Sequence, residues 1–177
     1  FRFWEDLSRA SRLPLVLFQI PVPNYWYDAE TINRIAALPN IVAYKEASFS
    51  LELYTETCRL LKASGRSMRV LTGNDRFVGK SYELGGVGAL IGMANLAVDR
   101  WAALDKAGRS GDYEGAIAIQ NELHELSHIV FAEPIVEAVS RIKAILVDEG
   151  HIAHAGTRPP QMGIDNAERE RVLRSYR

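Results

Sequence analysis

The sequence has little of several features that define other classes of protein. Cys58 is its single cysteine, so no disulfide can form within the chain. No apolar run approaches the roughly 20 residues that a membrane span needs, and no signal peptide is recognisable. The 21 basic and 22 acidic residues nearly cancel, and no basic stripe or like-charge block is present. We therefore expect a cytoplasmic protein with no nucleic-acid partner and no membrane partner.

The sequence does contain the material for a folded globular domain. Of its 177 residues, 47% are hydrophobic and 24% are charged, which is typical of a globular protein with a sizeable core. Four apolar runs with β-strand character lie in the first part of the chain, at 15–20, 41–47, 69–72 and 87–93. Helical patterns separate them, and capping residues begin these helices at Asp28, Ser50 and Asp75.

This alternation of strands and helices predicts an α/β fold with a parallel sheet. Four such βα units are half of an eight-stranded βα barrel or a small open sheet, and the pattern alone does not choose between them. After residue 98 the pattern becomes helical, and helices are predicted at 99–107, 112–130, 134–148 and 165–176. We therefore expect two units, a βα block at 1–98 and a helical domain at 99–177.

Lys45 is the most informative residue, because it lies near the end of the otherwise apolar strand at 41–47. Side chains alternate along a strand, so Lys45 shares a face with Ala43, whereas Tyr44 points to the other face. A lysine in this position can extend its ammonium group from the strand end into solvent. Alternatively, burial lowers the lysine pKa from about 10.4, and the neutral amine can attack a carbonyl carbon to form a Schiff base.

Two further motifs indicate other chemistry. His124, Glu125 and His128 match the H-E-x-x-H pattern of zinc hydrolases, but a catalytic zinc site needs a third protein ligand and an amphipathic helix also explains the spacing.

Gly79-Lys80-Ser81 resembles the end of a phosphate-binding loop. Five residues rather than four separate Gly73 from Gly79, and the segment reads better as a helix. We therefore expect neither a metal site nor a nucleotide site.

Four segments together resemble the dihydrodipicolinate synthase/N-acetylneuraminate lyase family of Schiff-base-forming class I aldolases. They are PLVLFQIP at 14–21, PNIVAYKEAS at 39–48, LTGND at 71–75 and LGGVGALIGMAN at 84–95. They occur in the order and at the spacing of the family, and the likeness runs from about Phe1 to the end of the chain. The second segment is similar to the strand that carries the family's Schiff-base lysine.

The resemblance implies a (β/α)8 TIM barrel followed by a C-terminal helical domain. Residues 1–98 then correspond to strands five to eight, the second half of the barrel, and residues 99–177 to the helical domain. The family's first four strands, with a carboxylate-binding loop and a tyrosine of the proton relay, have no counterpart here. The chain also opens at Phe1 rather than Met, so we expect a longer natural protein, and the resemblance implies a homotetramer.

The resemblance also implies a lyase reaction, either aldol cleavage or dehydration. The Lys45 amine is the catalytic nucleophile that condenses with the C2 carbonyl of pyruvate or a related 2-oxo acid. Phe18 lies in the pocket wall, and the backbone around Gly73 and Leu90 lines the substrate channel. No metal and no organic cofactor is required.

Two departures from the family pattern affect this prediction. Phe18 stands where the family usually has a tyrosine, and loss of a positioned acid–base group typically costs about 10²–10⁴-fold in rate. Pro23 stands where the synthase subgroup has an arginine for a dicarboxylic substrate. We therefore do not expect authentic dihydrodipicolinate synthesis. A bound water or another hydroxyl can replace the tyrosine, and the candidates are Tyr25, Tyr27, Ser48 and Thr72. The rival interpretation is a non-catalytic relative that binds a small oxo acid.

Overall fold

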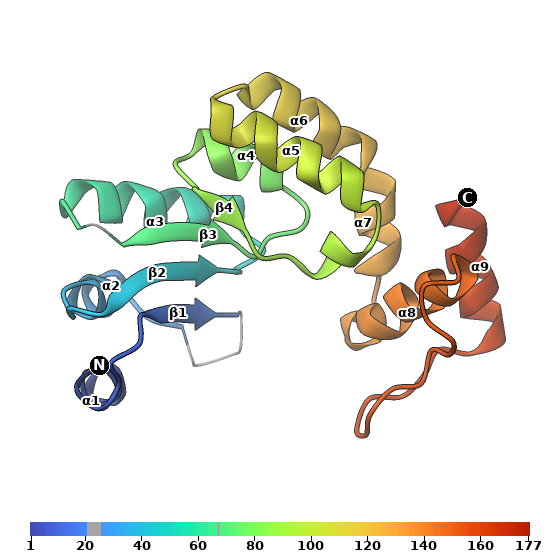
Figure 1. The fold of residues 1–177 in the computed structure, drawn as a ribbon, viewed down its shortest axis with the longest axis horizontal. Coiled ribbons are helices and arrows are strands. Elements are labelled where there is room, and N and C mark those ends of the chain that lie inside the picture. The colour runs from blue at the N-terminus through green and yellow to red at the C-terminus, as the bar shows by residue number, and fades with distance from the viewer. Residues whose placement is uncertain (21–25, 67) are drawn as a thin grey trace.

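The computed structural model of the chain describes residues 1–20, 26–66 and 68–177 (Figure 1). Its first part contains a sheet of four parallel strands in the order β1-β2-β3-β4. The strands are β1 (Leu15–Gln19), β2 (Ile41–Glu46), β3 (Arg69–Thr72) and β4 (Gly88–Ala89). The predicted parallel sheet is therefore confirmed. Because all four strands run in the same direction, their carboxyl ends meet at one edge.

One face of the sheet is covered by helices. Helix α1 (Arg2–Ala10) precedes β1, and α2 (Ala29–Ala36) and α3 (Leu51–Ala63) connect the first three strands. The side chains of Asp28 and Ser50 accept hydrogen bonds from the amides of Thr31 and Leu53, so both act as the predicted N-caps. A buried cluster joins this face to the helices, and it includes Leu17, Ile35, Tyr44, Tyr54, Leu61 and Val70.

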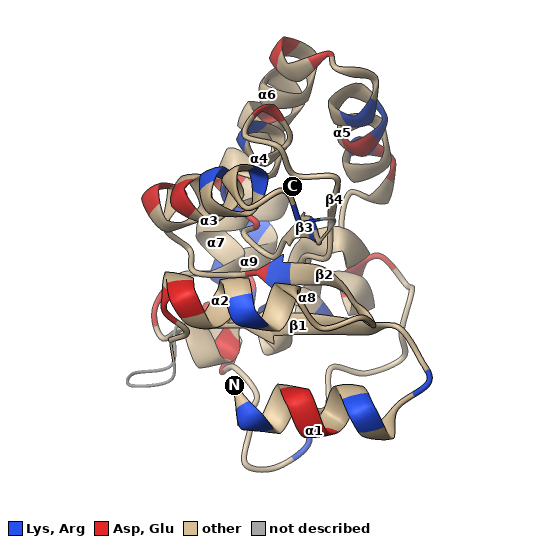
Figure 2. Cartoon of the chain, turned by 90° about the vertical axis from the view of Figure 1, so that its left-hand side faces the viewer, with Lys and Arg blue, Asp and Glu red and all other residues tan. Residues whose placement is uncertain are grey.

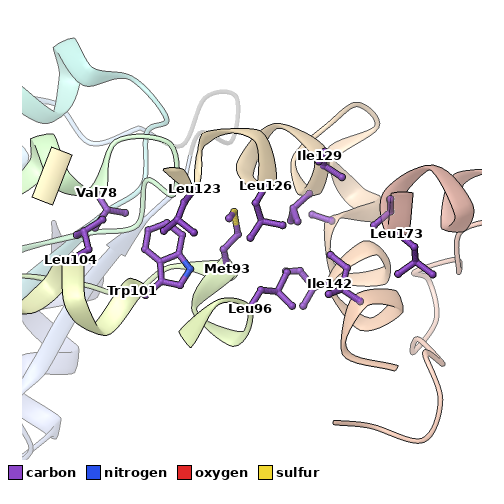
Figure 3. Close-up of a cluster of buried hydrophobic side chains, with 14 of the residues drawn as sticks. Val78, Met93, Leu96, Trp101, Leu104, Leu123, Leu126, Ile129, Ile142 and Leu173 are labelled. Atoms are coloured by element: carbon purple, nitrogen blue, oxygen red, sulfur yellow. The ribbon is translucent and has the colours of Figure 1, made fainter. Parts of the chain in front are cut away.

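The remaining helices form a second, mostly helical cluster. They are α4 (Val78–Glu83), α5 (Val98–Ser110), α6 (Tyr113–Glu122), α7 (His124–Val130), α8 (Ala138–Asp148) and α9 (Asn166–Tyr176). Their apolar side chains converge on a core that includes Met93, Leu96 and Trp101 (Figure 3). This core also contains Val78 and Tyr82 of α4, so a helix from the βα block shares it. The division of the chain at residue 98 stays a prediction.

Three predicted elements after residue 86 differ from the structure. The strand expected at 87–93 pairs only over Gly88–Ala89, and a 3₁₀ turn, η1 (Gly92–Asn95), follows because the buried Met93 enters the helical core. The helix expected at 112–130 is divided at Leu123, which leaves helical dihedral angles and is buried in that same core. The helix expected from 134 begins only at Ala138, after a 3₁₀ turn, η2 (Ile135–Glu137).

The other face of the sheet carries exposed apolar side chains. Val16, Phe18 and Leu90 are all more than two-fifths exposed, although β-sheet side chains of this type are normally packed in a core. A groove of about 500 Å³ runs over this face and is lined by Val16, Val42, Leu71 and Gly88, among others. The sheet therefore presents an apolar surface that nothing in the described part of the chain covers fully.

Charged residues lie mainly on the helices, with both signs interspersed along α1 and α3 (Figure 2). Several form exposed pairs within one helix, such as Arg59 with Glu56 and Lys80 with Glu83. Exposed pairs of this kind contribute little to stability.

No helix in the described part of the chain combines the length and the hydropathy that a membrane crossing requires.

Arg141 differs from these exposed charged residues, because its side chain is only 1% exposed. Its guanidinium group forms ion pairs with Glu137 at 2.8 Å and Glu168 at 2.6 Å. It also donates hydrogen bonds to the backbone carbonyls of Val130, Ala132 and Pro134. Hydrogen bonds from Arg171 and Arg141 lower the pKa of Glu168 to about 2. Arg141 therefore joins α8 to α9 and fixes the segment between α7 and α8.

We expect Arg141→Met to destabilise the protein by on the order of 3–5 kcal/mol, because it leaves two carboxylates and three carbonyls without their buried donor. Arg171→Met is the matched control. Arg171 binds the same Glu168 but is 43% exposed, so its loss should cost less than about 1 kcal/mol. Urea unfolding of the full-length protein at neutral pH measures both. Equal losses in the free energy of unfolding for the two substitutions would show that the burial of Arg141 does not increase its contribution to stability.

Candidate active site

Lys45 lies on the open face of the sheet, near the carboxyl end of β2. It is aligned with Phe18 of β1 and with Leu71 of β3, so the three side chains form a row across neighbouring strands. The Lys45 Nζ atom lies 4.0 Å from the centroid of the Phe18 ring. This distance allows a cation–π contact that favours the ammonium form. The structure therefore brings the predicted nucleophile and the predicted pocket-wall residue into direct contact.

The residues on either side of Lys45 point to the helix-covered face. Tyr44 is fully buried and donates a hydrogen bond to Gln19 at 2.9 Å, as expected from strand alternation. Glu46 is also fully buried, and its carboxylate accepts hydrogen bonds from the Asn74 side chain at 2.8 Å and the Ser48 amide at 3.1 Å. These polar contacts join the ends of β2 and β3 beneath Lys45. They fix the backbone from which Lys45 extends.

Gly73 lies against the side chain of Lys45. A Cβ atom at this position would come within 2.7 Å of the Ala47 Cβ and 3.0 Å of the Lys45 Cε. Any larger residue would therefore displace the lysine stem. The Gly73 amide donates to the Glu46 carbonyl at 2.7 Å, and the Leu90 amide donates to the Thr72 carbonyl at 2.8 Å. Both predicted backbone positions thus lie at the carboxyl ends of strands, but only Gly73 lies against Lys45. Leu90 pairs with the end of β3, and its side chain is exposed.

The Asp75 side chain has a different role from the one that the sequence predicts. The sequence predicts it as the cap of the next helix, but α4 begins only at Val78, with Phe77 as its N-cap. The Asp75 carboxylate instead accepts a hydrogen bond from the Met93 amide at 2.8 Å and is almost fully buried. Burial raises the pKa of Asp75, while the amides of Met93 and Gly92 and the charge of Lys45 oppose that rise.

The pKa of Lys45 is lowered from its ordinary value, because the partial burial of the amine disfavours its charged form. The negative charge of Asp75 acts in the opposite direction and favours the ammonium group. Burial is the larger of the two effects. At a given pH, the neutral fraction of the Lys45 amine is therefore larger than that of a solvated lysine. The neutral amine is the form that can attack a carbonyl carbon.

The hydroxyl groups considered as replacements for the missing tyrosine have other partners. The Thr72 hydroxyl accepts a hydrogen bond from Ser81 of α4 at 3.0 Å, on the helix-covered face. The Ser48 hydroxyl donates to the Ser50 carbonyl at 3.1 Å, and Tyr27 accepts from the Trp4 indole at 3.0 Å. Tyr25 and Pro23 lie outside the described residues. None of the three described hydroxyls forms a hydrogen bond with Lys45.

The two alternative motifs occupy other parts of the molecule. The rings of His124 and His128 lie 4.3 Å apart on α7, but no third histidine, cysteine, aspartate or glutamate joins them within residues 1–20, 26–66 and 68–177. Gly79-Lys80-Ser81 is helical, as expected, and forms part of α4. A Cβ at Gly79 would come within 2.7 Å of the Ala116 carbonyl oxygen, so this glycine allows α4 and α6 to pack closely.

The sequence places Asn74 and Asp75 at the strand ends, where sites of α/β proteins lie, but it assigns neither residue a role beside Lys45. Both are buried, and they connect β3 to the residues around Lys45 and to the turn at Met93. The available signal was their position directly after β3, since the carboxyl ends of adjacent parallel strands meet at one edge. The sequence instead predicts Asp75 as a helix cap, which is a common role of Asp before a helix.

The chain is similar to curated proteins and to solved structures. One relative, 4-hydroxy-tetrahydrodipicolinate synthase 2 of Clostridium acetobutylicum, is 27% identical over 173 residues, which are 97% of this chain and 58% of the relative. The 4-hydroxy-tetrahydrodipicolinate synthase of Acidiphilium cryptum is 34% identical over 134 residues, 75% of this chain and 44% of the relative. The chain therefore spans less than two-thirds of the length of these relatives.

A crystal structure of a chloride-inhibited dihydrodipicolinate synthase from Acinetobacter baumannii complexed with pyruvate matches with a TM-score of 0.84 at 25% identity. The match covers 98% of this chain and 58% of that one. The dihydrodipicolinate synthase structure from Bacteroides thetaiotaomicron matches with a TM-score of 0.83 at 21% identity. That match covers 98% of this chain and 59% of the other chain, and it shows the same fold. A sequence model described as the Dihydrodipicolinate synthetase family matches residues 2–176, so the chain belongs to that family.

Proposed function

We propose that this chain carries the covalent catalytic centre of a Schiff-base-forming lyase that acts on pyruvate or a related 2-oxo acid. The observation that carries the proposal is the environment of Lys45. Its amine is partly buried, has a lowered pKa and lies at the carboxyl end of a parallel strand, where sites of α/β proteins are found. The family membership and the pyruvate complex of the Acinetobacter baumannii relative support the same chemistry.

In the proposed reaction the neutral Lys45 amine attacks the C2 carbonyl carbon of the oxo acid, and water leaves to give an iminium ion. The positive nitrogen then accepts the electron pair released when a bond at C3 breaks, which permits aldol cleavage or loss of water. The reverse steps form the bond. Asp75 favours the cationic form of the nitrogen through its nearby charge, and Gly73 leaves room for the lysine stem.

We further propose that the sheet is the second half of a (β/α)8 barrel and that residues 99–177 are its C-terminal helical domain. The exposed apolar face of the sheet supports this proposal, because Val16, Phe18 and Leu90 are the kind of side chains that fill a barrel interior. So does the coverage of 58% of the Acinetobacter baumannii synthase. A homotetramer and a cytoplasmic location stay predictions.

We also propose that the full-length protein is not an authentic dihydrodipicolinate synthase. Phe18 contacts the Lys45 amine where a proton donor is expected, and phenylalanine cannot exchange a proton. The same residue favours the second candidate function, a non-catalytic relative that binds an oxo acid reversibly. The two functions differ in one measurable respect, the formation of a covalent bond at Lys45.

Borohydride reduction of the full-length protein in the presence of pyruvate should add one reduced pyruvate unit to Lys45, detectable by peptide mass spectrometry. Lys45→Arg should abolish the adduct, because a guanidinium group is not a nucleophile at neutral pH. Lys80→Ala should retain it, since the Lys80 amine is paired with Glu83 on the outer helix α4. Reversible pyruvate binding without an adduct would instead support the non-catalytic relative.

Phe18→Tyr should increase turnover by about 10²–10⁴-fold, because it places a hydroxyl next to the amine that forms the Schiff base. The expected change is in kcat, with little change in the KM for pyruvate. Phe3→Tyr is the matched control, since Phe3 is an exposed residue of α1, a helix whose Trp4 packs in the cluster on the helix-covered face. Unchanged turnover in Phe18→Tyr would mean that protons reach the Schiff base by another path.

The rate of reductive trapping should rise with pH and reach its midpoint below 10.5, the ordinary pKa of lysine. Asp75→Asn should move this midpoint to lower pH. Removing the negative charge removes the effect that raises the Lys45 pKa, so the neutral amine forms at lower pH, while the asparagine oxygen can still accept the Met93 hydrogen bond. A midpoint that moves upwards would contradict the assigned interaction between the two side chains.

A further inference from the structure

A second pocket lies at the amino end of the sheet, which is the end that faces the viewer in Figure 2. It has a volume of about 440 Å³, within the range of small-molecule sites. The last turns of α3, the start of β3, the end of α4 and Tyr113 of α6 line it. We call it the basic pocket, because Lys62, Arg66 and Arg69 are among its lining residues.

The basic pocket differs from the groove on the open face of the sheet. Cys58, Leu61, Met68 and Val70 line it, and all four belong to the buried cluster on the helix-covered face. The two hollows share few lining residues, among them Arg69 at the start of β3. The proposed first half of the barrel, which would cover the open face, therefore does not explain this pocket.

Three cationic side chains of the basic pocket are without a partner in the described part of the chain. Lys62, Arg66 and Arg69 are exposed, and none of them forms an ion pair or a side-chain hydrogen bond there. Arg59 of the same helix α3, by contrast, pairs with Glu56 at 2.6 Å. The three charges of the pocket are therefore available to a negatively charged ligand.

Neither a carboxylate nor a helix end accounts for these three cations. Glu83 is the one acidic residue in the described lining, and Lys80 already pairs with it at 2.6 Å. Cations near the C-terminus of a helix can also bind its last carbonyls. In α3, however, Ser64 and Gly65 donate hydrogen bonds to carbonyls of the last turn. The basic pocket therefore has an excess of positive charge.

The floor of the basic pocket is apolar. Cys58, Met68 and Val70 are buried, and burial raises the pKa of the Cys58 thiol to about 11, so the thiol is uncharged at neutral pH. The Tyr113 ring is 39% exposed and adds a partly apolar surface at the start of α6. An inorganic ion would leave this floor uncovered, and a neutral apolar molecule would leave the cations without a partner.

We propose that the basic pocket binds a small organic anion that has an apolar body and a phosphate or carboxylate head. The head contacts the three cations, since ammonium and guanidinium groups form charge-assisted hydrogen bonds with both kinds of oxyanion. The body covers the apolar floor and packs against the Tyr113 ring. This binding site does not depend on the Schiff-base function, because Lys45 lies near the carboxyl end of its strand.

Isothermal titration calorimetry of the full-length protein tests the proposal with four probes: phenyl phosphate, benzoate, inorganic phosphate and benzyl alcohol. The better aromatic anion should bind at least about tenfold more tightly than inorganic phosphate, which lacks the body, and benzyl alcohol, which lacks the charge. Tighter binding of phenyl phosphate supports a phosphate head, and tighter binding of benzoate supports a carboxylate head. Equal affinity for either control probe, or no binding of either aromatic anion at millimolar concentration, overturns the proposal.

Two variants locate the binding. The double substitution Lys62→Met and Arg66→Met should weaken binding of the better probe at least about tenfold, whereas Arg59→Met, on the same helix, should not. Tyr113→Glu should also weaken binding, because it adds a carboxylate to the pocket. Negative charge suits the start of α6, so this variant keeps the test decisive if the double variant unfolds. Unchanged affinity in both pocket variants overturns the proposal, as does competition by pyruvate, which would place the probe at Lys45.

Discussion

The parallel pairing of β1, β2 and β3 is the constraint on which the candidate site depends. Its register places Phe18, Lys45 and Leu71 in one row on the open face of the sheet. The lysine amine therefore lies between an aromatic ring on one neighbouring strand and the start of the Gly73 turn on the other. A shift of one residue in this register would turn Lys45 towards the helices, where an unpaired ammonium group is strongly unfavourable.

The polar groups beneath the sheet edge make this register rigid. Glu46 and Asn74 are buried and hydrogen-bonded to each other, and they connect the end of β2, which carries Lys45, to the residues that follow β3. Burial raises the pKa of Glu46, and the hydrogen bonds from Ser48 and Asn74 oppose that rise. The chemistry on the open face thus depends on a satisfied polar network on the covered face.

The helical part of the chain contributes to the site as well as to stability. Arg141 is buried and donates hydrogen bonds to the carbonyls on both sides of Phe131. The Phe131 ring in turn lies close to Gly92 and packs against Phe49. A side chain deep in the second core therefore determines where an aromatic ring stands at the edge of the sheet.

The local features of this protein follow from its amino-acid sequence alone. Apolar runs and capping residues such as Asp28 and Ser50 located the first three strands and the helices between them, and strand alternation correctly separated Tyr44 from Lys45. Motif likeness identified the family. These features depend on neighbouring residues, which a single sequence displays directly.

The roles of residues whose partners are distant along the chain become visible only in the folded protein. Asp75 reads as a helix cap, yet its carboxylate binds Met93 and acts on Lys45. Leu123 reads as the middle of one helix, yet the core that buries it divides that helix. Phe49 and Phe131 carry no sequence signal that they meet. Local propensities are weak compared with burial and long-range hydrogen bonds, so only the folded chain shows which contacts prevail.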